Sequence, residues 1–194
     1  MIEDCTAIIL AGGDSQRMGR DKANILLGDQ TLLQCVIATM QQIFPHVIVS
    51  VRQPRPEINL LQICDEQPDS GPLAGLAASL GHVTTPWAFA VACDMPFVVP
   101  SIVEYLAKQR AAHQAVVPVV RGHPQPLAAF YAISCLVTIR EQLLGGEKNS
   151  LRAVLEQLQV RYVDEAELLK VDPTLRSFFD LDTPQDVALA VKMR

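Results

Sequence analysis

Residues 6–22 read TAIILAGGDSQRMGRDK, and this stretch decides the fold class. Its first part, Thr6–Leu10, is a short apolar run, which predicts a buried strand. A glycine-rich turn follows directly. Such a turn brings backbone N–H groups close to phosphates, because glycine has no Cβ in the way. Arg17 and Lys22 then supply two cations that would neutralise phosphate oxygens. The stretch therefore predicts a phosphate-binding loop after the first strand of an α/β fold.

Two commoner phosphate-binding patterns do not fit this loop. The pattern G-x-x-x-x-G-K-[ST] needs a lysine directly after its second glycine, whereas Gly19 is followed by Arg20. The pattern G-x-G-x-x-G is absent as well. The alternative interpretation is a plain glycine-rich turn with solvated charges. Two cations and a third glycine in the same stretch favour phosphate binding.

Along the rest of the chain, short apolar runs alternate with helical patterns. We predict further strands at Val47–Val51, Leu60–Cys64, Trp87–Cys93, Ala115–Val120 and Pro126–Tyr131. We predict helices at Thr31–Ile43, Leu73–Leu80, Ser101–Ala112, Ile133–Leu144, Ser150–Leu158 and Pro184–Lys192. This alternation predicts right-handed crossovers and a mostly parallel sheet, in a single α/β domain that spans residues 1–194.

Three helix starts carry capping signals of their own. The Ser101–Glu104 spacing predicts a capping box, and Asp164–Glu167 offers a weaker version of it. Thr183-Pro184 places a hydroxyl before a proline, which suits the first helical position.

The composition excludes several functional classes. Charged residues make up 19% of the chain, below the usual ~25%, as expected for a sheet with both faces covered. A net charge of −5 and the lack of a basic run argue against a nucleic-acid partner. No apolar stretch is long enough for a membrane span, and the N-terminus lacks the positive charge of a signal peptide. Five cysteines without C-x-x-C spacing are expected to be reduced residues of a cytoplasmic protein.

Acidic residues directly follow two of the predicted strands. Asp65 follows Leu60–Cys64, and Asp94 follows Trp87–Cys93. Ligands of open parallel sheets bind outside the carboxyl ends of the strands, where the glycine-rich loop would also lie. Asp94 therefore predicts a Mg²⁺ site, because Mg²⁺ takes one or two carboxylates together with phosphate oxygens. The alternatives are that Asp94 caps the turn before Pro96 and that Asp65 belongs to a solvated loop.

Two further segments have both a plain and a functional interpretation. Gly71–Gly75 reads GPLAG, which suits either tight helix–sheet packing or a nucleotide lying across the start of a helix. His123–Pro126 reads HPQP, which is either an ordinary turn or a polar loop that faces a second substrate.

Together these motifs resemble the molybdenum cofactor guanylyltransferase (MobA) family. The resemblance rests on Leu10–Gly13, Arg17–Gly19, Asp21-Lys22, Gly71–Gly75 and Cys93–Pro96, in order and spacing, and on Phe179–Asp186 near the C-terminus. It implies a Rossmann-like, three-layer nucleotidyltransferase fold. It also implies transfer of GMP from Mg²⁺–GTP to the phosphate of Mo-molybdopterin, with release of pyrophosphate. Other molybdenum cofactor biosynthesis proteins or acceptor enzymes would be its partners.

The resemblance also implies roles for individual residues. By position, GTP would be bound by Leu10, Ala11, Gly12, Lys22, Asp65 and Asp94. Gly13 of the loop and Pro72 and Leu73 at the helix start complete the expected nucleotide site. Arg17, Lys22 and Asp94 are the expected catalytic residues, and Asp94 would also bind Mg²⁺.

Two positions depart from the family pattern. An asparagine that the family often has after its second strand corresponds to Ser50, so this position is left out of the expected site. The family's N-x-N-T-P motif reads D-L-D-T-P here, with aspartates at 180 and 182. We hypothesise that Asp182 is a second metal ligand beside Asp94. The alternative is that Asp182 only caps the following helix, and Asp180 is expected to matter less.

Two other functions remain open from the sequence alone. A related cytidylyltransferase or sugar-phosphate nucleotidyltransferase would use the same loop for another base or acceptor. A nucleotide-binding module without turnover would bind the nucleotide but would release no pyrophosphate.

Overall fold

The computed structural model describes residues 1–12, 21–64, 71–145 and 149–193. Its main sheet has eight strands: β1 (Cys5–Leu10), β4 (His46–Val51), β5 (Leu61–Cys64), β6 (Trp87–Ala92), β7 (Ala115–Val120), β8 (His123–Pro124), β9 (Ala128–Ala132) and β10 (Val160–Val163). Two short strands, β2 (Leu26–Leu27) and β3 (Gln30–Thr31), form a separate hairpin. The helices are α1 (Leu32–Ile43), α2 (Gly71–Leu80), α3 (Pro100–Ala107), α4 (Cys135–Gly145), α5 (Leu151–Leu155), α6 (Glu165–Leu168) and α7 (Pro184–Met193). Two 3₁₀ turns are η1 (Lys22–Asn24) and η2 (Arg176–Phe178).

The sheet is mostly parallel, as the alternation of strands and helices predicts. Its order is β10-β7-β9-β6-β1-β4-β5, with β8 paired to β7. The pairs β1–β4, β1–β6, β4–β5 and β7–β10 are parallel, and β9 runs antiparallel to both of its neighbours. The chain goes from β1 to β4 on one side and later returns to β6 on the other. The carboxyl end of β1 is therefore a topological switch point, where open α/β sheets bind ligands.

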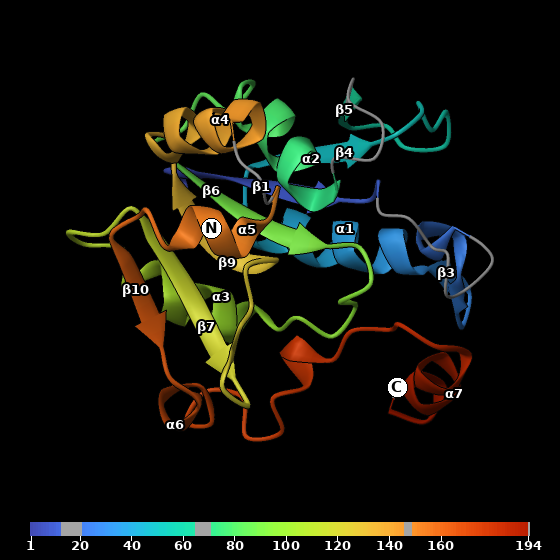
Figure 1. Ribbon diagram of the computed structural model, residues 1–194. Helices are drawn as coiled ribbons and strands as arrows, with labels where there is room; N and C mark the ends of the chain where they lie inside the picture. The colour runs from blue at the N-terminus through green and yellow to red at the C-terminus, as the bar shows by residue number, and fades with distance from the viewer. Residues whose placement is uncertain (13–20, 65–70, 146–148, 194) are drawn as a thin grey trace.

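Helices cover both faces of the sheet, which gives the three layers expected (Figure 1). Ala7 and Ile9 of β1 belong to the core cluster that contains residues of α1 and α3. Ile8 and Leu10 belong to the opposite cluster, with residues of α2, α4 and α5. All six residues of β1 are buried, so the strand is apolar on both faces, as the low charged content indicates.

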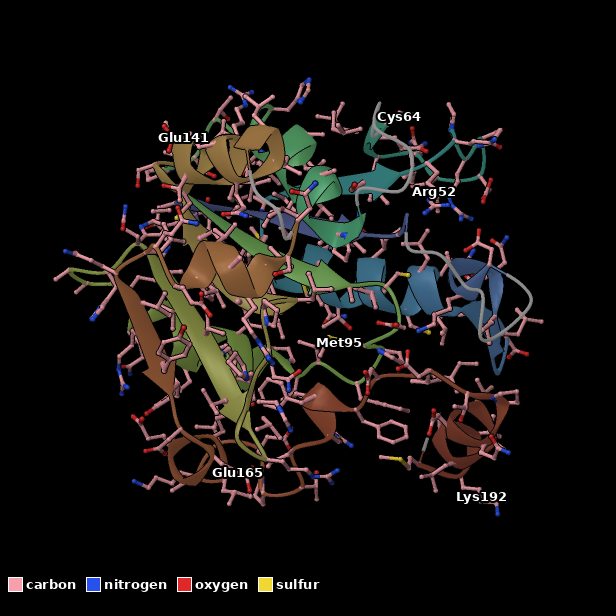
Figure 2. The ribbon with its side chains drawn as sticks, viewed as in Figure 1. Arg52, Cys64, Met95, Glu141, Glu165 and Lys192 are labelled. Atoms are coloured by element: carbon pink, nitrogen blue, oxygen red, sulfur yellow. The ribbon has the colours of Figure 1, made fainter. Side chains whose placement is uncertain are left out.

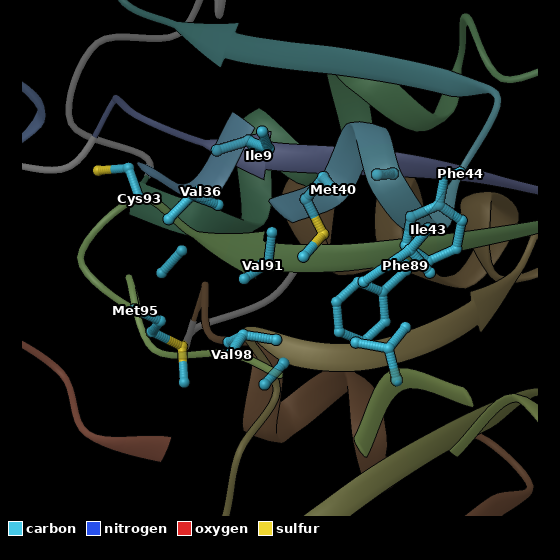
Figure 3. Packing of buried hydrophobic residues seen from close by; sticks show 14 of the residues in the cluster. Ile9, Val36, Met40, Ile43, Phe44, Phe89, Val91, Cys93, Met95 and Val98 are labelled. Atoms are coloured by element: carbon cyan, nitrogen blue, oxygen red, sulfur yellow. The ribbon is translucent and has the colours of Figure 1, made fainter. Parts of the chain in front are cut away.

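Aromatic rings pack together in the core cluster that lies on the α1 and α3 side of the sheet (Figure 3). The ring of Phe89 on β6 lies 5.7 Å from that of Phe44 and 4.8 Å from that of Phe130. All three side chains are almost completely buried, and each contributes roughly 1.5–3 kcal/mol of transfer free energy. This packing holds β6 beside β9 and against the end of α1.

The cysteines agree with a core role in three of five cases. Cys5, Cys93 and Cys135 are buried, Cys35 is partly buried, and Cys64 is exposed at the end of β5. All five are free thiols. Among the described residues, no helix combines the length and apolar character needed to cross a membrane.

One predicted capping signal is wrong and two are confirmed. Helix α3 begins at Pro100 with Val99 as its N-cap, so Ser101 lies inside the helix and forms no capping box. The Asp164–Glu167 box at α6 forms in both directions. At α7 the Thr183 hydroxyl accepts the N–H of Asp186 at 3.2 Å.

Candidate active site

Three predicted site residues from distant parts of the chain meet at one point. The Lys22 Nζ atom donates to Asp94 Oδ2 at 2.7 Å and also forms an ion pair with Asp182 Oδ1. The side chains of Lys22 and Asp94 are 18% and 17% exposed, whereas that of Asp182 is 38% exposed. One cation is thus shared between two carboxylates at the edge where the parallel strands end.

A single 3₁₀ turn places Lys22. Asp21 caps η1, since its Oδ1 accepts the N–H of Ala23 at 3.0 Å. The Ala23 side chain is buried in the core, and the N–H of Ile25 donates to the Lys22 carbonyl at 3.0 Å. The backbone on both sides of Lys22 is therefore held, and only its side chain extends toward the carboxylates.

Backbone hydrogen bonds place Asp94 and draw Asp182 to it. The N–H of Cys93 donates to the Leu10 carbonyl at 3.1 Å, which extends the β1–β6 pairing by one residue. The Asp94 carbonyl accepts the N–H of Leu181 at 3.0 Å. Because Leu181 is fully buried in a cluster with Ile25, the next residue, Asp182, lies beside Asp94.

A buried aspartate upstream secures the segment that leads to Asp182. The carboxylate of Asp172 accepts the Ser177 N–H at 2.9 Å and the Thr174 hydroxyl at 3.0 Å. The Ser177 hydroxyl in turn accepts the N–H of Val99 at 3.2 Å. Burial alone would raise the pKa of Asp172, but these hydrogen bonds outweigh it and lower the pKa below its usual value.

The capping role at α7 belongs to Thr183 and not to the Asp182 side chain. Asp186 Oδ2 accepts the N–H groups of Asp182, at 3.2 Å, and of Thr183, at 2.7 Å. Its hydrogen bonds with Thr183 lower the pKa of the Asp186 carboxyl. The carboxylate of Asp182 is directed to Lys22 instead.

The charges around Lys22 influence one another. Burial would lower the pKa of Lys22, but the hydrogen bonds to Asp182 and Asp94 raise it above its usual value, so the ammonium stays charged at neutral pH. Partial loss of hydration, followed by the negative charges of Asp182 and Asp94, raises the pKa of Asp180. Asp180 therefore senses the same cluster, although no hydrogen bond links it to Lys22 among the bonds described.

A cavity of about 150 Å³ lies beside this cluster. It is formed by the ends of three parallel strands, the start of α2, η1 and the segment before β9. Its lining residues are Leu10, Ala11, Gly12, Asp21, Lys22, Ser50, Val51, Arg52, Gly71, Pro72, Gly75, Ala92, Cys93, Asp94 and Leu127. In Figure 2, Arg52 at the right follows β4 and Met95 near the centre follows β6, and these residues mark the edge. The cavity therefore occupies the switch point beside β1.

Most of the predicted nucleotide-binding residues line this cavity. Leu10, Ala11, Gly12, Lys22, Pro72 and Asp94 do so. The side chain of Leu73 is buried in the core beneath α2 and does not line it. Gly13, Arg17 and Asp65 lie outside the described residues.

Gly75 permits a close approach in the cavity wall, whereas at Gly12 a Cβ would make only an ordinary contact. A Cβ on Gly75 of α2 would lie 2.7 Å from Ser50 Oγ and 3.2 Å from Leu10 Cδ2. A Cβ on Gly12 would lie 3.4 Å from Cγ of Arg52. The tight-packing interpretation of the GPLAG segment is therefore confirmed, and the first residues of α2 line the cavity, where the predicted nucleotide would lie.

Sequence reasoning missed the contributions of β4 and of Asp21 to the cavity wall. Ser50 was set aside because it departs from the family pattern, yet it lines the cavity, as does Arg52. Ser50 and Arg52 lie at the carboxyl end of β4, so the rule that ligands bind at the carboxyl ends of parallel strands would have found these two residues. His123 pairs with Val120 in the β7–β8 hairpin and does not line the cavity, whereas Leu127 from the next segment does.

The cavity wall as described does not favour nucleophilic catalysis by a cysteine or by a serine–histidine pair. Burial, helped by the negative charge of Asp94, raises the pKa of the Cys93 thiol to about 12, so no thiolate forms near neutral pH. No histidine is among the described residues that line the cavity. The wall offers cations, carboxylates and backbone groups, which suits phosphate chemistry.

Comparison with known proteins agrees with this geometry. The family model of the MobA-like NTP transferase domain matches residues 7–162. The chain is 33% identical over 187 residues to a "probable molybdenum cofactor guanylyltransferase" of Pelotomaculum thermopropionicum, with 95% of this chain and 91% of that one covered. A protein of the same description from Chloroflexus aggregans is 36% identical, with coverage of 95% and 92%. The chain belongs to the molybdenum cofactor guanylyltransferase (MobA) family.

A solved structure of a MobA relative supports the assignment. Molybdopterin-guanine dinucleotide biosynthesis protein A from Archaeoglobus fulgidus superposes with a TM-score of 0.85 at 28% identity, with 97% of each chain covered. The family resemblance predicted from the motifs and the nucleotidyltransferase fold are both confirmed. As a MobA family member, the chain is a nucleotidyltransferase.

Proposed function

We propose that the chain is a single nucleotidyltransferase domain that transfers GMP from Mg²⁺–GTP to the phosphate of Mo-molybdopterin. The product is the molybdopterin guanine dinucleotide cofactor, and pyrophosphate is released. One observation supports this most: the Lys22 ammonium lies between Asp94 and Asp182 at the wall of a cavity on the switch point. We also propose a cytoplasmic location, with other molybdenum cofactor biosynthesis proteins or acceptor enzymes as partners.

GTP would lie across the end of β1 and the start of α2. Gly12 leaves space for phosphates near the backbone, and Leu10, Ala11 and Pro72 form the adjoining wall. The positive end of the α2 dipole favours anions at the same place. The proposal includes Gly13 and Asp65, and it assigns Arg17 and Lys22 to the triphosphate.

The carboxylates fit a divalent metal. Asp94 Oδ2 and Asp182 Oδ1 already contact one common cation, the Lys22 ammonium, so their spacing allows a single ion to be shared. Both are hard oxygen donors, which suit Mg²⁺ together with phosphate oxygens. Among the described residues, no group of three or more His, Cys, Asp or Glu side chains forms a complete metal cage. Bound Mg²⁺ would neutralise charge on the phosphates that react and leave.

The reaction needs alignment and charge neutralisation more than proton transfer. An oxygen of the molybdopterin phosphate forms a bond to the α-phosphorus of GTP, and the bond from this phosphorus to the bridging oxygen of pyrophosphate breaks. The attacking phosphate is already anionic, so no general base is required. Lys22 is protonated beside the carboxylates, and if Mg²⁺ took its place between them the ammonium would be available to the departing pyrophosphate.

Pyrophosphate release tests the proposal. The purified protein is incubated with Mo-molybdopterin, Mg²⁺ and, in separate reactions, GTP, CTP or UTP. We expect pyrophosphate with GTP only when the acceptor is present. Preference for CTP would indicate a cytidylyltransferase. Nucleotide binding without pyrophosphate release would indicate a module without turnover.

A further inference from the structure

We propose that Arg55 is a positioning residue for GTP binding, which acts through Asp21 by neutralising its carboxylate and fixing the turn that carries Lys22. The inference rests on the proposed function. Arg55 comes from the proline-rich segment between β4 and β5.

The Arg55 side chain bridges two residues of the η1 turn. Its Nη1 donates to Asn24 Oδ1 at 2.8 Å, and its Nη2 forms an ion pair with Asp21 Oδ2. The side chain is only 13% exposed, although it belongs to a loop with exposed neighbours. A guanidinium has the fork geometry for such a double contact, which a lysine cannot reproduce.

The backbone of Arg55 is itself held to the sheet. The side-chain amide of Gln62, on β5, accepts the Arg55 N–H at 2.7 Å and donates to the Arg55 carbonyl at 2.9 Å. The same amide donates to the Ile58 carbonyl at 3.0 Å. Pro56 also restricts Arg55 to extended backbone. Arg55 is therefore anchored to the sheet and can hold η1 in place.

Asp21 is the link between Arg55 and the nucleotide site. It lines the cavity beside Lys22, whereas Arg55 does not. Its Oδ1 caps η1 through the N–H of Ala23, and its Oδ2 faces Arg55. An uncompensated carboxylate at this place would repel the triphosphate and attract Lys22 away from it. Arg55 removes both effects without contacting the substrate.

The chain offers a matched control. Arg110 forms an ion pair with Asp4 at 3.0 Å and is 15% exposed, close to the 13% of Arg55. Arg110 does not line the cavity and packs over the rings of Trp87, the first residue of β6, and Phe130. Its loss should therefore affect stability but not GTP affinity.

The experiment measures the Kd for Mg²⁺–GTP by calorimetry, and Tm is measured for the same proteins. The variants are Arg55→Met, Arg55→Lys, Asp21→Asn, the double variant Arg55→Met/Asp21→Asn and the control Arg110→Met. We expect Arg55→Met to raise the Kd about tenfold, the effect of losing one charged hydrogen bond. Arg55→Lys should raise it less. In the Asp21→Asn background the same change should have little effect, because the two residues are coupled. Added salt should shrink the Arg55→Met effect.

An Arg55→Met variant that binds GTP like the parent would overturn the inference, as would an effect of equal size in the Asp21→Asn background. If Arg55→Met does not fold, Arg55→Lys is compared in the two backgrounds instead. A parent protein that binds no nucleotide would refute the proposed function and the Arg55 role with it. A parent that prefers CTP or UTP would refute only the choice of GTP, and the comparison is then made with that nucleotide.

Discussion

Replacing Asp182 with asparagine tests whether this carboxylate is a metal ligand. The substitution keeps the shape and one oxygen but removes the charge that Asp182 shares with Asp94 around Lys22. Losing one of two carboxylates should raise the Mg²⁺ concentration for half-maximal rate about tenfold, equivalent to ~1.4 kcal/mol. The measurement is the initial rate of pyrophosphate release over a Mg²⁺ series at saturating GTP.

The same variant should unfold at nearly the parent temperature. The Asp182 side chain is 38% exposed, so its ion pair with Lys22 contributes at most about 0.5 kcal/mol. In a chain of this size that shifts Tm by about 1–2 °C. The helix cap is left intact, because Thr183 and Asp186 provide it.

Asp186→Asn is the matched control for this prediction. It removes the charged acceptor of two backbone N–H groups at the start of α7, a loss of ~1 kcal/mol, and Asp186 is linked to Lys22 only by the weakest of the charge effects on its pKa. We expect a lower Tm and an unchanged Mg²⁺ requirement. If Asp182→Asn also leaves the Mg²⁺ requirement unchanged, the ligand hypothesis is wrong and Asp182 serves only the Lys22 ion pair.

Three further predictions follow from the site and its supports. Asp94→Asn should lower the rate by at least about a hundredfold while circular dichroism stays that of the parent; near-normal turnover at high Mg²⁺ would refute its role. Lys22→Ala should weaken GTP binding at least about tenfold in calorimetry, and parental affinity would make Lys22 only a partner of the carboxylates. The pKa of Asp172 is lowered by folding, so its stabilisation is present above the usual aspartate pKa of ~3.9 and is lost as pH falls through the folded value. Asp172→Asn should therefore lower the free energy of unfolding at pH 7, measured in urea titrations, by about 1–2 kcal/mol. The variant should also lose less stability than the parent as the pH falls into the acid range. Equal losses in parent and variant would contradict this.

The regular parts of the fold were predictable because their patterns are local. Strand β7 was predicted with its observed bounds, Ala115–Val120, since a continuous apolar run has clear ends. Strand β10 was missed because Val160–Val163 reads VRYV, a short edge segment without a clear apolar pattern. Helix α3 ends at Ala107 and not at Ala112, because Arg110 turns back and donates to the Ala107 carbonyl at 2.8 Å.

The site was predictable only as far as strand ends reveal it. Asp94 and Lys22 follow from the rule that ligands gather at the carboxyl ends of parallel strands. The place of Asp182 depends on the backbone bond from Leu181 to Asp94, which no local pattern shows. Arg55 was missed for the same reason, since its role comes from contacts with Asp21 and Asn24 more than thirty residues earlier in the chain.

The contact between Gly75 and Ser50 has a consequence for protein engineering. A Cβ on Gly75 would stand 2.7 Å from Ser50 Oγ and 3.2 Å from Leu10 Cδ2, so any side chain at position 75 requires these residues to give way or α2 to move away from β4. Positions 10, 50 and 75 should therefore be varied together in any library of variants that is screened for altered nucleotide selectivity. Substitutions of Gly75 should be screened together with changes at positions 50 and 10, because a single substitution at Gly75 would mainly report on how far α2 can shift.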